Sequence, residues 1–484
     1  MLYSVAFVIF FVSYLGLASV GHRFILHQLY VKRLIRLFEY GQKKVEKIHR
    51  KAQQKRRYKK KLSQAISNGS DSDRLSIQTD SSIASSESDN DSAFDDDYDM
   101  MDGWFEIESF QDSAIIFFFF VSFPIVPFAF CPSKTLNLEL EKNKHRLNLS
   151  TIMDFVSLSI QAIVDDTVTK RFNAEELKCW NLLTRTNKIH HYHSLRLASI
   201  WLIGLCVRYL ILFPFRMMIA LVCGLWFVMT MTLIGLLPEN RIKRFAYYYL
   251  SIMGFRMLSR AFSMVITYHD SKNLAKSGGT CVANHTSPID VIVLHCNNAY
   301  ALVGQKHSGV LGFFQTALSK ATSHIWFDRF EVKDRTQVSK RLRDHSNDKT
   351  KLPILVFPEG TCINNSAVMM FKKGSFETDG IIYPVAIKYD GRFGDPFWNS
   401  NKYGYAKYLL MMMTSWAVVC DVWFLPPMTR QDNETAIEFA SRVKAEIAKK
   451  GGLVDLDWDG QLKRQKVKPE MLKQQQYKFS REIE

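Results

Sequence analysis

Apolar residues are gathered in long runs in the first half of the chain and in short alternating runs in the second half. The first run, Met1 to Val20, is nearly uncharged and about long enough to span a bilayer. Basic residues follow this run and none precedes it. This order favours a signal-anchor membrane helix over residues 1–22, with a cleaved signal peptide as the alternative, and keeps the following flank in the cytosol.

Residues 23–103 are mostly polar and fall into two blocks. Residues 23–62 form a polybasic juxtamembrane segment that includes "KKVEKIHRKAQQKRRYKKK", which ends at Lys61. We expect a solvated charged helix that can also bind anionic lipid headgroups, and the scarcity of aromatic residues argues against nucleic acid as a partner. Residues 63–103 are rich in Ser and Asp, which predicts a disordered linker.

A second apolar run interrupts the polar pattern at residues 104–135. It carries Pro124 and Pro127, and two prolines so close together break a helix. The run therefore predicts a re-entrant or membrane segment rather than a straight span. Residues 136–196 are expected to form a helical region that precedes the next membrane segment.

Residues 197–237 contain two apolar runs separated by Pro214-Phe215-Arg216. Basic residues flank both outer ends, which predicts a membrane helical hairpin whose ends both return to the cytosol. Residues 238–264 mix Arg, Tyr, Phe and Met, a composition typical of an amphipathic interfacial helix.

Residues 265–457 change to short strand-like runs that alternate with helical stretches. This pattern predicts an α/β catalytic domain with a central sheet, followed by a polar tail at 458–484. The strand-like runs are "TCVAN", "AYALVG", "HIWF", "LPILVF", "IIYPVAIKY" and "AVVCDVWFL".

Charge and cysteine content limit the classes of protein. The formal net charge is +16 and the pI is about 9.3, so an anionic partner is expected. The 8 cysteines include no CxxC pair, which indicates reduced thiols and no zinc site. The histidines His295, His307 and His324 have no metal-ligand spacing, so we expect no metal.

The stretch "NHTSPID" places His285 and Asp290 after an apolar strand, with Pro288 between them. Histidine titrates near pH 6.5 and suits general-base catalysis, and a carboxylate can orient the imidazole. No nucleophile accompanies the pair, since Ser287 lacks a GxSxG elbow. The predicted proton donor is therefore a substrate hydroxyl, whereas an esterase or a simple capped turn would be the competing interpretations.

Two further groups of residues are candidates for substrate binding. In "FPEGT", Gly360 allows close approach of the backbone, and Thr361 and exposed amides suit a phosphate or hydroxyl, beside the Glu359 carboxylate. In "WFDR", Arg329 has the fork that binds phosphate, although a salt bridge is an equal alternative.

These blocks together resemble the membrane glycerolipid acyltransferases, in which "NHTSPID" is similar to the NHxxxxD box and "FPEGT" to the second signature. "WFDR" resembles the intermediate arginine block and "YPVAIKY" the proline-containing fourth block. "NLLTRTN", "FPEGTCINNSAVMMFKKGSFE" and "LPPMTR" are similar to the microsomal glycerol-3-phosphate acyltransferases. The likeness runs from about Ser150 to the C-terminus, and Ser323 stands where many relatives have glycine.

The resemblance implies a central mixed sheet flanked by helices, with N-terminal membrane helices, and a catalytic pair of His285 and Asp290. It implies transfer of an acyl group from acyl-CoA to glycerol 3-phosphate without a cofactor, acyl-CoA being a substrate. Arg329, Glu359, Gly360 and Thr361 would bind the glycerol phosphate. Lys372 and Lys373 are candidates for CoA-phosphate contacts, with solvated surface lysines as the alternative.

The implied location is the endoplasmic reticulum membrane, as a multi-pass protein with its catalytic domain facing the cytosol. Lysophosphatidic acid remains an alternative acceptor, because the catalytic pair cannot distinguish the two. A catalytically inactive membrane scaffold is the alternative from another class.

Overall fold

The structure is a computed structural model. It describes residues 2–22, 25–68, 168, 170–175, 177, 180, 182–183, 195–327, 332–378, 380–463, 469–470, 473 and 477. Arg329 and the segment 104–135 lie outside the described residues, as do most of 63–103 and of 136–196. The chain divides into two units, Met1–Glu46 with Leu158–Glu484, and Lys47–Ser157. The first unit is described below.

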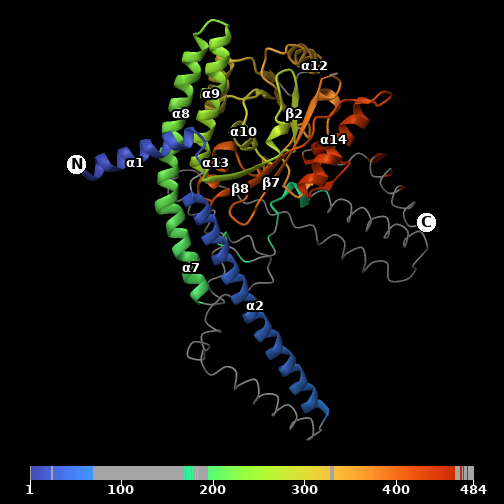
Figure 1. Cartoon of the computed structure of the whole chain (residues 1–484). Coiled ribbons are helices and arrows are strands. Elements are labelled where there is room, and N and C mark those ends of the chain that lie inside the picture. Colours follow the sequence, from blue (N-terminus) through green and yellow to red (C-terminus); the bar gives the residue numbers. More distant parts are fainter. Residues whose placement is uncertain are drawn as a thin grey trace. The chain divides into compact units, whose positions relative to one another are not determined.

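A seven-stranded sheet in the order β1-β8-β7-β2-β5-β3-β4 forms the centre of the catalytic domain (Figure 1). Neighbouring strands are parallel except β7 and β8, which are antiparallel, so the sheet is mixed as expected. The strands are β1 (Met264–His269), β2 (Thr280–Ala283), β3 (Ala301–Gln305), β4 (Ile325–Phe327), β5 (Ile354–Val356), β7 (Ile382–Tyr389) and β8 (Val418–Phe424). A separate two-stranded sheet pairs β6 (Ala367–Val368) with β9 (Val454–Asp455).

Alternation along the strands explains why helices cover both faces of this sheet. In β2, Cys281 and Ala283 belong to one apolar core and Val282 belongs to the other, as the two-residue period of a strand requires. The first core joins the sheet to α8, α9, α10, α11 and α13, and the second joins it to α14. The helices are α8 (Phe213–Gly235), α9 (Arg241–Ser259), α10 (Asp290–His295), α11 (Gly309–Ala321), α12 (Val332–Asn347), α13 (Tyr405–Met413) and α14 (Ala436–Gly451).

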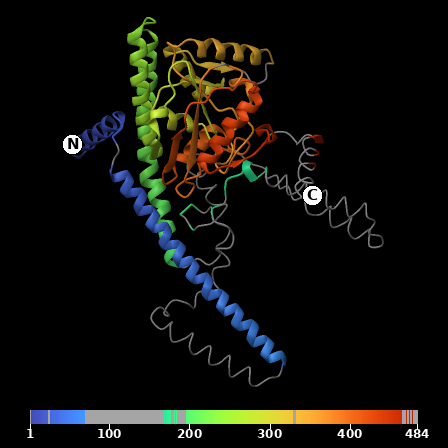
Figure 2. The same cartoon turned by 45° about the vertical axis from the view of Figure 1, so that its right-hand side comes forward.

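The hairpin expected over 197–237 is wrong, because α7 (Leu195–Cys206) and α8 continue into one another (Figure 2). A π-helical turn, Val207–Leu212, joins them, and the Phe213 N–H donates to the Arg208 carbonyl five residues back. The widened turn moves the hydrogen-bond register just before Pro214, so the ring is accommodated without breaking the helix. The resulting helix, Leu195–Gly235, has 41 residues and is long and apolar enough to cross a membrane.

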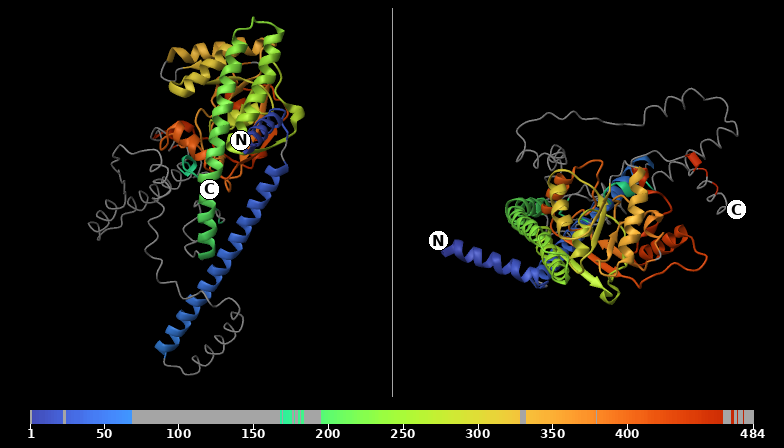
Figure 3. Two further views of the ribbon diagram at one scale, coloured as in Figure 1. Left: turned by 90° about the vertical axis from the view of Figure 1, so that its left-hand side faces the viewer. Right: turned by 90° about the horizontal axis from the view of Figure 1, so that it is seen from above.

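The N-terminal helices share the catalytic domain's core. In α1 (Leu2–Ser19), Phe11 and Leu15 pack into the same cluster as α8, α9 and α10, while Figure 3 shows α1 extending away from that contact. The amphipathic α2 (Ile25–Asn68) runs past the polybasic segment and six residues into the predicted linker. Helix α9 is present as predicted, and its inner face is buried in the core.

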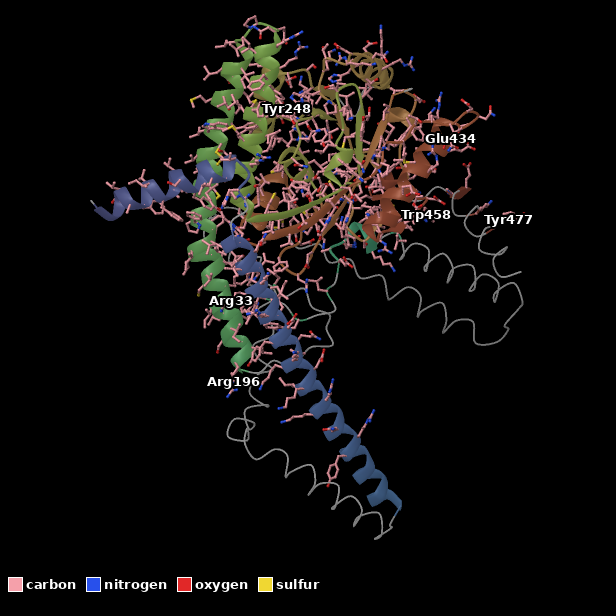
Figure 4. All side chains as sticks on the ribbon, in the orientation of Figure 1. Arg33, Arg196, Tyr248, Glu434, Trp458 and Tyr477 are labelled. Atoms are coloured by element: carbon pink, nitrogen blue, oxygen red, sulfur yellow. The ribbon has the colours of Figure 1, made fainter. Side chains whose placement is uncertain are left out.

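The boundary predicted at 458 needs correction, because the packed domain extends to Lys463. Trp458 is buried with Val168, Ile363 and Met369, and it lies on the same side of the domain as α14 (Figure 4). The polar composition of the tail gave no indication of this contact, because one tryptophan supplies most of the tail's apolar surface.

Candidate active site

The candidate catalytic loops meet at one edge of the sheet. Strand β2 pairs in parallel with β5 and with β7, so the carboxyl ends of all three lie together. The loop after β2 carries His285, the loop after β5 carries Glu359, and β7 ends at Tyr389.

The structure brings His285 and Asp290 together. The Nδ1 atom of His285 lies 2.8 Å from Asp290 Oδ2. The same oxygen accepts the N–H groups of Thr286 at 2.8 Å and Ser287 at 3.0 Å. Asp290 therefore anchors the turn that starts α10 as well as the imidazole, so the capped-turn and catalytic interpretations describe the same carboxylate.

The second oxygen of Asp290 is also occupied. The Tyr389 hydroxyl donates to Oδ1 at 2.5 Å, and the carboxylate is fully buried. A carboxylate that only accepts requires the proton to be on Nδ1 of His285, which leaves the lone pair on Nε2. The base therefore acts through Nε2.

Cys362 occupies the space in front of Nε2. Its Sγ lies 3.3 Å from His285 Nε2, and the Phe357 ring stacks on the imidazole with 4.3 Å between centroids. Burial alone would lower the pKa of His285, but the Cys362 thiol and the Asp290 carboxylate outweigh it and raise the pKa to about 10. With Cys362 in this position His285 therefore holds its Nε2 proton at neutral pH, and it can act as a base only when another group replaces the thiol.

Glu359 is directed at backbone amides. Oε1 accepts the His285 N–H at 2.7 Å and Oε2 accepts the Met369 N–H at 2.9 Å, with the side chain 1% exposed. Burial raises the pKa of Glu359 to about 8. Glu359 thus acts here as a positioning residue for His285, and a direct contact with substrate stays a prediction.

The other residues that were predicted to bind substrate do not all lie together. Gly360 has φ +66°, and a Cβ there would lie 3.2 Å from Lys372 Nζ, so Lys372 lies over the glycine loop. Thr361 packs its methyl group against Gly460. Lys373 instead pairs with Glu377 at 2.9 Å. Arg329 lies outside the described residues and its role stays a prediction.

Asparagines extend the sheet's hydrogen bonding into the site. Asn284 donates to the Ile387 carbonyl at 2.9 Å and accepts from its N–H at 2.8 Å. Asn365 donates to Thr286 Oγ1 at 2.9 Å and accepts the Tyr389 N–H at 2.7 Å. These bonds fix the catalytic loop to β7, and they bury the amide of Asn284, which stands in an NHT glycosylation sequon.

Cys362, Tyr389 and Asn365 were not predicted as site residues. Cys362 directly follows "FPEGT" and Tyr389 ends the predicted strand "IIYPVAIKY", so position alone could have suggested both. Across the described ranges, no three His, Cys, Asp or Glu side chains are grouped to hold a metal ion.

Comparisons with known proteins find acyltransferases. The family model described as "Acyltransferase" covers residues 265–388. The chain is 56% identical over 335 residues to "Glycerol-3-phosphate acyltransferase 3" of Xenopus laevis, covering 69% of this chain and 75% of that protein. It is 55% identical over 341 residues to "Glycerol-3-phosphate acyltransferase 4" of Homo sapiens, covering 70% and 75%.

Among solved structures, the 1-acyl-sn-glycerophosphate acyltransferase PlsC from Thermotoga maritima aligns with a TM-score of 0.39 and 17% identity, over 55% of this chain and 100% of that one. Identity above one half across three quarters of a curated relative, together with the matching domain, identifies this chain as an acyltransferase that belongs to the family of the glycerol-3-phosphate acyltransferases 3 and 4.

Proposed function

We propose that this enzyme transfers the acyl group of acyl-CoA to the first hydroxyl of glycerol 3-phosphate and produces lysophosphatidic acid. The printed names of the relatives support the acceptor. The observation that carries the mechanism is the imidazole of His285, held on Nδ1 by Asp290 at 2.8 Å, with Nε2 facing the loop after β5.

The reaction begins when the acceptor hydroxyl replaces the Cys362 thiol at Nε2. His285 removes the hydroxyl proton as the oxygen attacks the thioester carbonyl, and Asp290 stabilises the imidazolium. The tetrahedral intermediate then collapses, the C–S bond breaks, and the imidazolium proton passes to the CoA sulfur. No cofactor enters the sequence, because acyl-CoA is itself a substrate.

Phosphate recognition is proposed for the glycine loop and for Arg329. Lys372, which lies over Gly360, brings an ammonium to the loop next to the base. A phosphate bound there would place the glycerol hydroxyl close to His285 Nε2.

We place the catalytic domain on the cytosolic face of the endoplasmic reticulum membrane. The buried amide of Asn284 and the basic residues around the apolar segments support this orientation. The multi-pass arrangement was predicted from the signal anchor, the segment 104–135 and the hairpin, and one continuous helix replaces the hairpin. Trp416 contacts the long helix at Gly204 and Lys320 contacts it at Gly235, about 47 Å apart. Because this exceeds the bilayer core of about 30 Å, we propose that the helix lies along the membrane surface.

An acceptor assay tests the proposal. The full-length protein in neutral detergent is given labelled acyl-CoA with either glycerol 3-phosphate or lysophosphatidic acid. We expect faster acylation of glycerol 3-phosphate, and preferential acylation of lysophosphatidic acid would refute the acceptor.

The His285→Ala variant tests the base in the same assay. We expect a loss of about 10² to 10⁴ in rate with membrane attachment unchanged. His269→Ala is a matched control, because His269 of β1 pairs with Asp421 of β8 at 2.8 Å through partly exposed side chains. Undiminished turnover in His285→Ala would refute the assigned base, whereas a catalytically inactive scaffold would show no turnover in the wild type either.

A further inference from the structure

The C-terminal strap, which we define as residues 456–463, lies against the loop that follows β5. A Cβ on Gly460 would lie 2.5 Å from Thr361 Cγ2 and 3.3 Å from the Glu359 carbonyl oxygen, so the strap can come this close only because the residue is glycine. The strap ends in a short 3₁₀-helix whose last residue is Lys463. The close approach brings a basic side chain to the active site from a part of the chain that was predicted to be a polar tail.

The ammonium group of Lys463 joins two loops. Its Nζ donates to the Cys362 carbonyl at 3.0 Å and to the Trp398 carbonyl at 3.3 Å. It also lies 4.8 Å from the centroid of the Phe397 ring, and the residue is 8% exposed. Because a buried ammonium is costly unless it is hydrogen-bonded, the two carbonyls hold the lysine in one position, and the lysine in turn holds the two loops together.

The first of these loops is bonded to the backbone of the catalytic base. The Ile363 N–H donates to the His285 carbonyl at 3.1 Å. This N–H belongs to the same peptide group as the Cys362 carbonyl, so the ammonium of Lys463 polarises the group that binds His285 and strengthens that bond. The Cys362 thiol lies 3.3 Å from His285 Nε2. Lys463 therefore fixes both the backbone of the base and the thiol in front of its accepting atom.

The second loop is bonded to the next residue of the catalytic loop. The Trp398 N–H donates to the Thr286 carbonyl at 3.3 Å. The Thr286 N–H in turn donates to Asp290 Oδ2 at 2.8 Å, the oxygen that also orients the imidazole. A second chain of hydrogen bonds thus leads from Lys463 to the carboxylate of the catalytic pair.

We propose that Lys463 is a positioning residue for acyl transfer, which holds the Cys362–Ile363 peptide group and Trp398 and thereby fixes His285. A lysine suits this task, because its flexible stem reaches from the strap and its compact ammonium donates to two carbonyls at once. The inference rests on the general-base mechanism proposed above. It makes the C-terminal strap a part of the active site.

The Lys463→Met variant tests the role, because it keeps the apolar stem and removes the ammonium. Full-length protein in neutral detergent is assayed with labelled acyl-CoA and glycerol 3-phosphate from about pH 6 to about pH 10. We expect kcat to fall about tenfold, since hydrogen bonds from a charged group are lost. The KM of each substrate should stay within about twofold of the wild-type value, because a positioning residue acts on the base and not on substrate binding.

The pH profile separates positioning from a purely structural role. Asp290, Cys362 and Glu359 each contact His285. Of these, Cys362 accepts a hydrogen bond from Lys463, and its thiol is one cause of the raised pKa of His285. Release of the loop should therefore move the acid limb of the kcat/KM profile to lower pH. In a Cys362→Ala background, Lys463→Met should lower kcat without moving that limb further.

Lys444→Met is the matched control, because Lys444 is also buried and holds the other end of the strap. Its Nζ donates to the Leu456 carbonyl at 2.9 Å and to Asp457 Oδ1 at 3.0 Å. We expect a lower melting temperature in both lysine variants and a wild-type pH profile in Lys444→Met. Asn401→Ala is a second probe, because it removes the bond from Asn401 Nδ2 to the Lys463 carbonyl at 3.0 Å. It should move the acid limb in the same direction by a smaller amount.

An unchanged profile in Lys463→Met, or in Asn401→Ala if Lys463→Met does not fold, would overturn the inference. An equal shift in Lys444→Met would also overturn it, since any loosening of the strap would then suffice. A further shift in the Cys362→Ala background would contradict the path through the thiol. His285→Ala is assayed alongside. Turnover retained there contradicts the mechanism itself, whereas an inactive His285→Ala beside wild-type kinetics in Lys463→Met contradicts only the role of Lys463.

Discussion

Replacing Cys362 by alanine distinguishes direct acyl transfer from a covalent acyl-enzyme. Cys362 Sγ lies 3.3 Å from His285 Nε2, and His285 Nδ1 lies 2.8 Å from Asp290 Oδ2. This is the arrangement of a thiol nucleophile with its base and orienting carboxylate. A direct mechanism needs the imidazole and not the thiol. A thioester on the enzyme would need both.

The size of the effect separates the two mechanisms. A thiol is a weak hydrogen-bond donor, and a typical neutral hydrogen bond contributes about 0.5 to 1.5 kcal/mol, so its loss should change kcat/KM by about tenfold at most. Loss of a covalent nucleophile would instead match the loss in His285→Ala. We expect Cys362→Ala to keep turnover within about tenfold of the wild type.

The pH profile provides a second readout. Burial lowers the pKa of His285, while Cys362 and Asp290 raise it to about 10, and a raised pKa keeps the imidazole protonated to higher pH. Activity that requires neutral imidazole then rises with pH through that pKa. Removing the thiol removes one cause of the rise, so the acid limb of the kcat/KM profile should move to lower pH.

The assay measures labelled product from pH 6 to 10, and acid-quenched protein is examined for a hydroxylamine-sensitive acyl group. Cys223→Ala, a buried cysteine on α8, is the control and should shift neither rate nor profile. An acyl group trapped on wild-type Cys362, with Cys362→Ala as inactive as His285→Ala, would refute direct transfer.

The other predictions concern the orientation of the base and the phosphate loop. Asp290→Asn should lower kcat by about 10⁴ with the fold intact, because an amide no longer enforces the tautomer; steady-state kinetics with circular dichroism measure this, and a loss below tenfold would contradict it. Tyr389→Phe removes one bond to that carboxylate and should lower kcat about tenfold without changing the KM for either substrate. Lys372→Gln should raise the KM for glycerol 3-phosphate about tenfold, whereas Lys373→Gln, which alters an exposed ion pair, should leave it unchanged. Gly360→Ala forces a β-carbon into φ +66° at about 1 to 2 kcal/mol, so kcat/KM should fall about tenfold, and wild-type kinetics would contradict the close approach.

Local patterns predicted the elements that depend on nearby residues. Each of the six strand-like runs overlaps a strand, and the helix after Pro288 begins at Asp290. The meeting of His285 with Asp290 was predicted for the same reason, since five residues and one turn join them. Segments whose residues interact over a short sequence distance, or alternate strongly between apolar and polar, have few other conformations available.

Contacts between segments that are far apart in the sequence could not be predicted from the local pattern of apolar and polar residues. Tyr389 reaches Asp290 across 99 residues, and Arg171 donates to Ser366 across 195. The continuity of the long helix was not predicted, because proline usually breaks a helix. Here one π-helical turn accommodates the proline and the helix continues. The local structure at such positions depends on which distant residues the fold places beside them.

The apolar N-terminal helix and the catalytic pair share one packed core. Phe11 and Leu15 of α1 pack in the same core as Val293 and Leu294 of α10, the helix that begins at Asp290. The Tyr268 hydroxyl donates to the Val293 carbonyl at 2.6 Å, which fixes α10 to the edge strand β1. Because packed cores transmit displacement, any movement of α1 or β1 would move the helix that carries Asp290. The contacts that stabilise the fold therefore also fix the position of the base relative to the apolar helices.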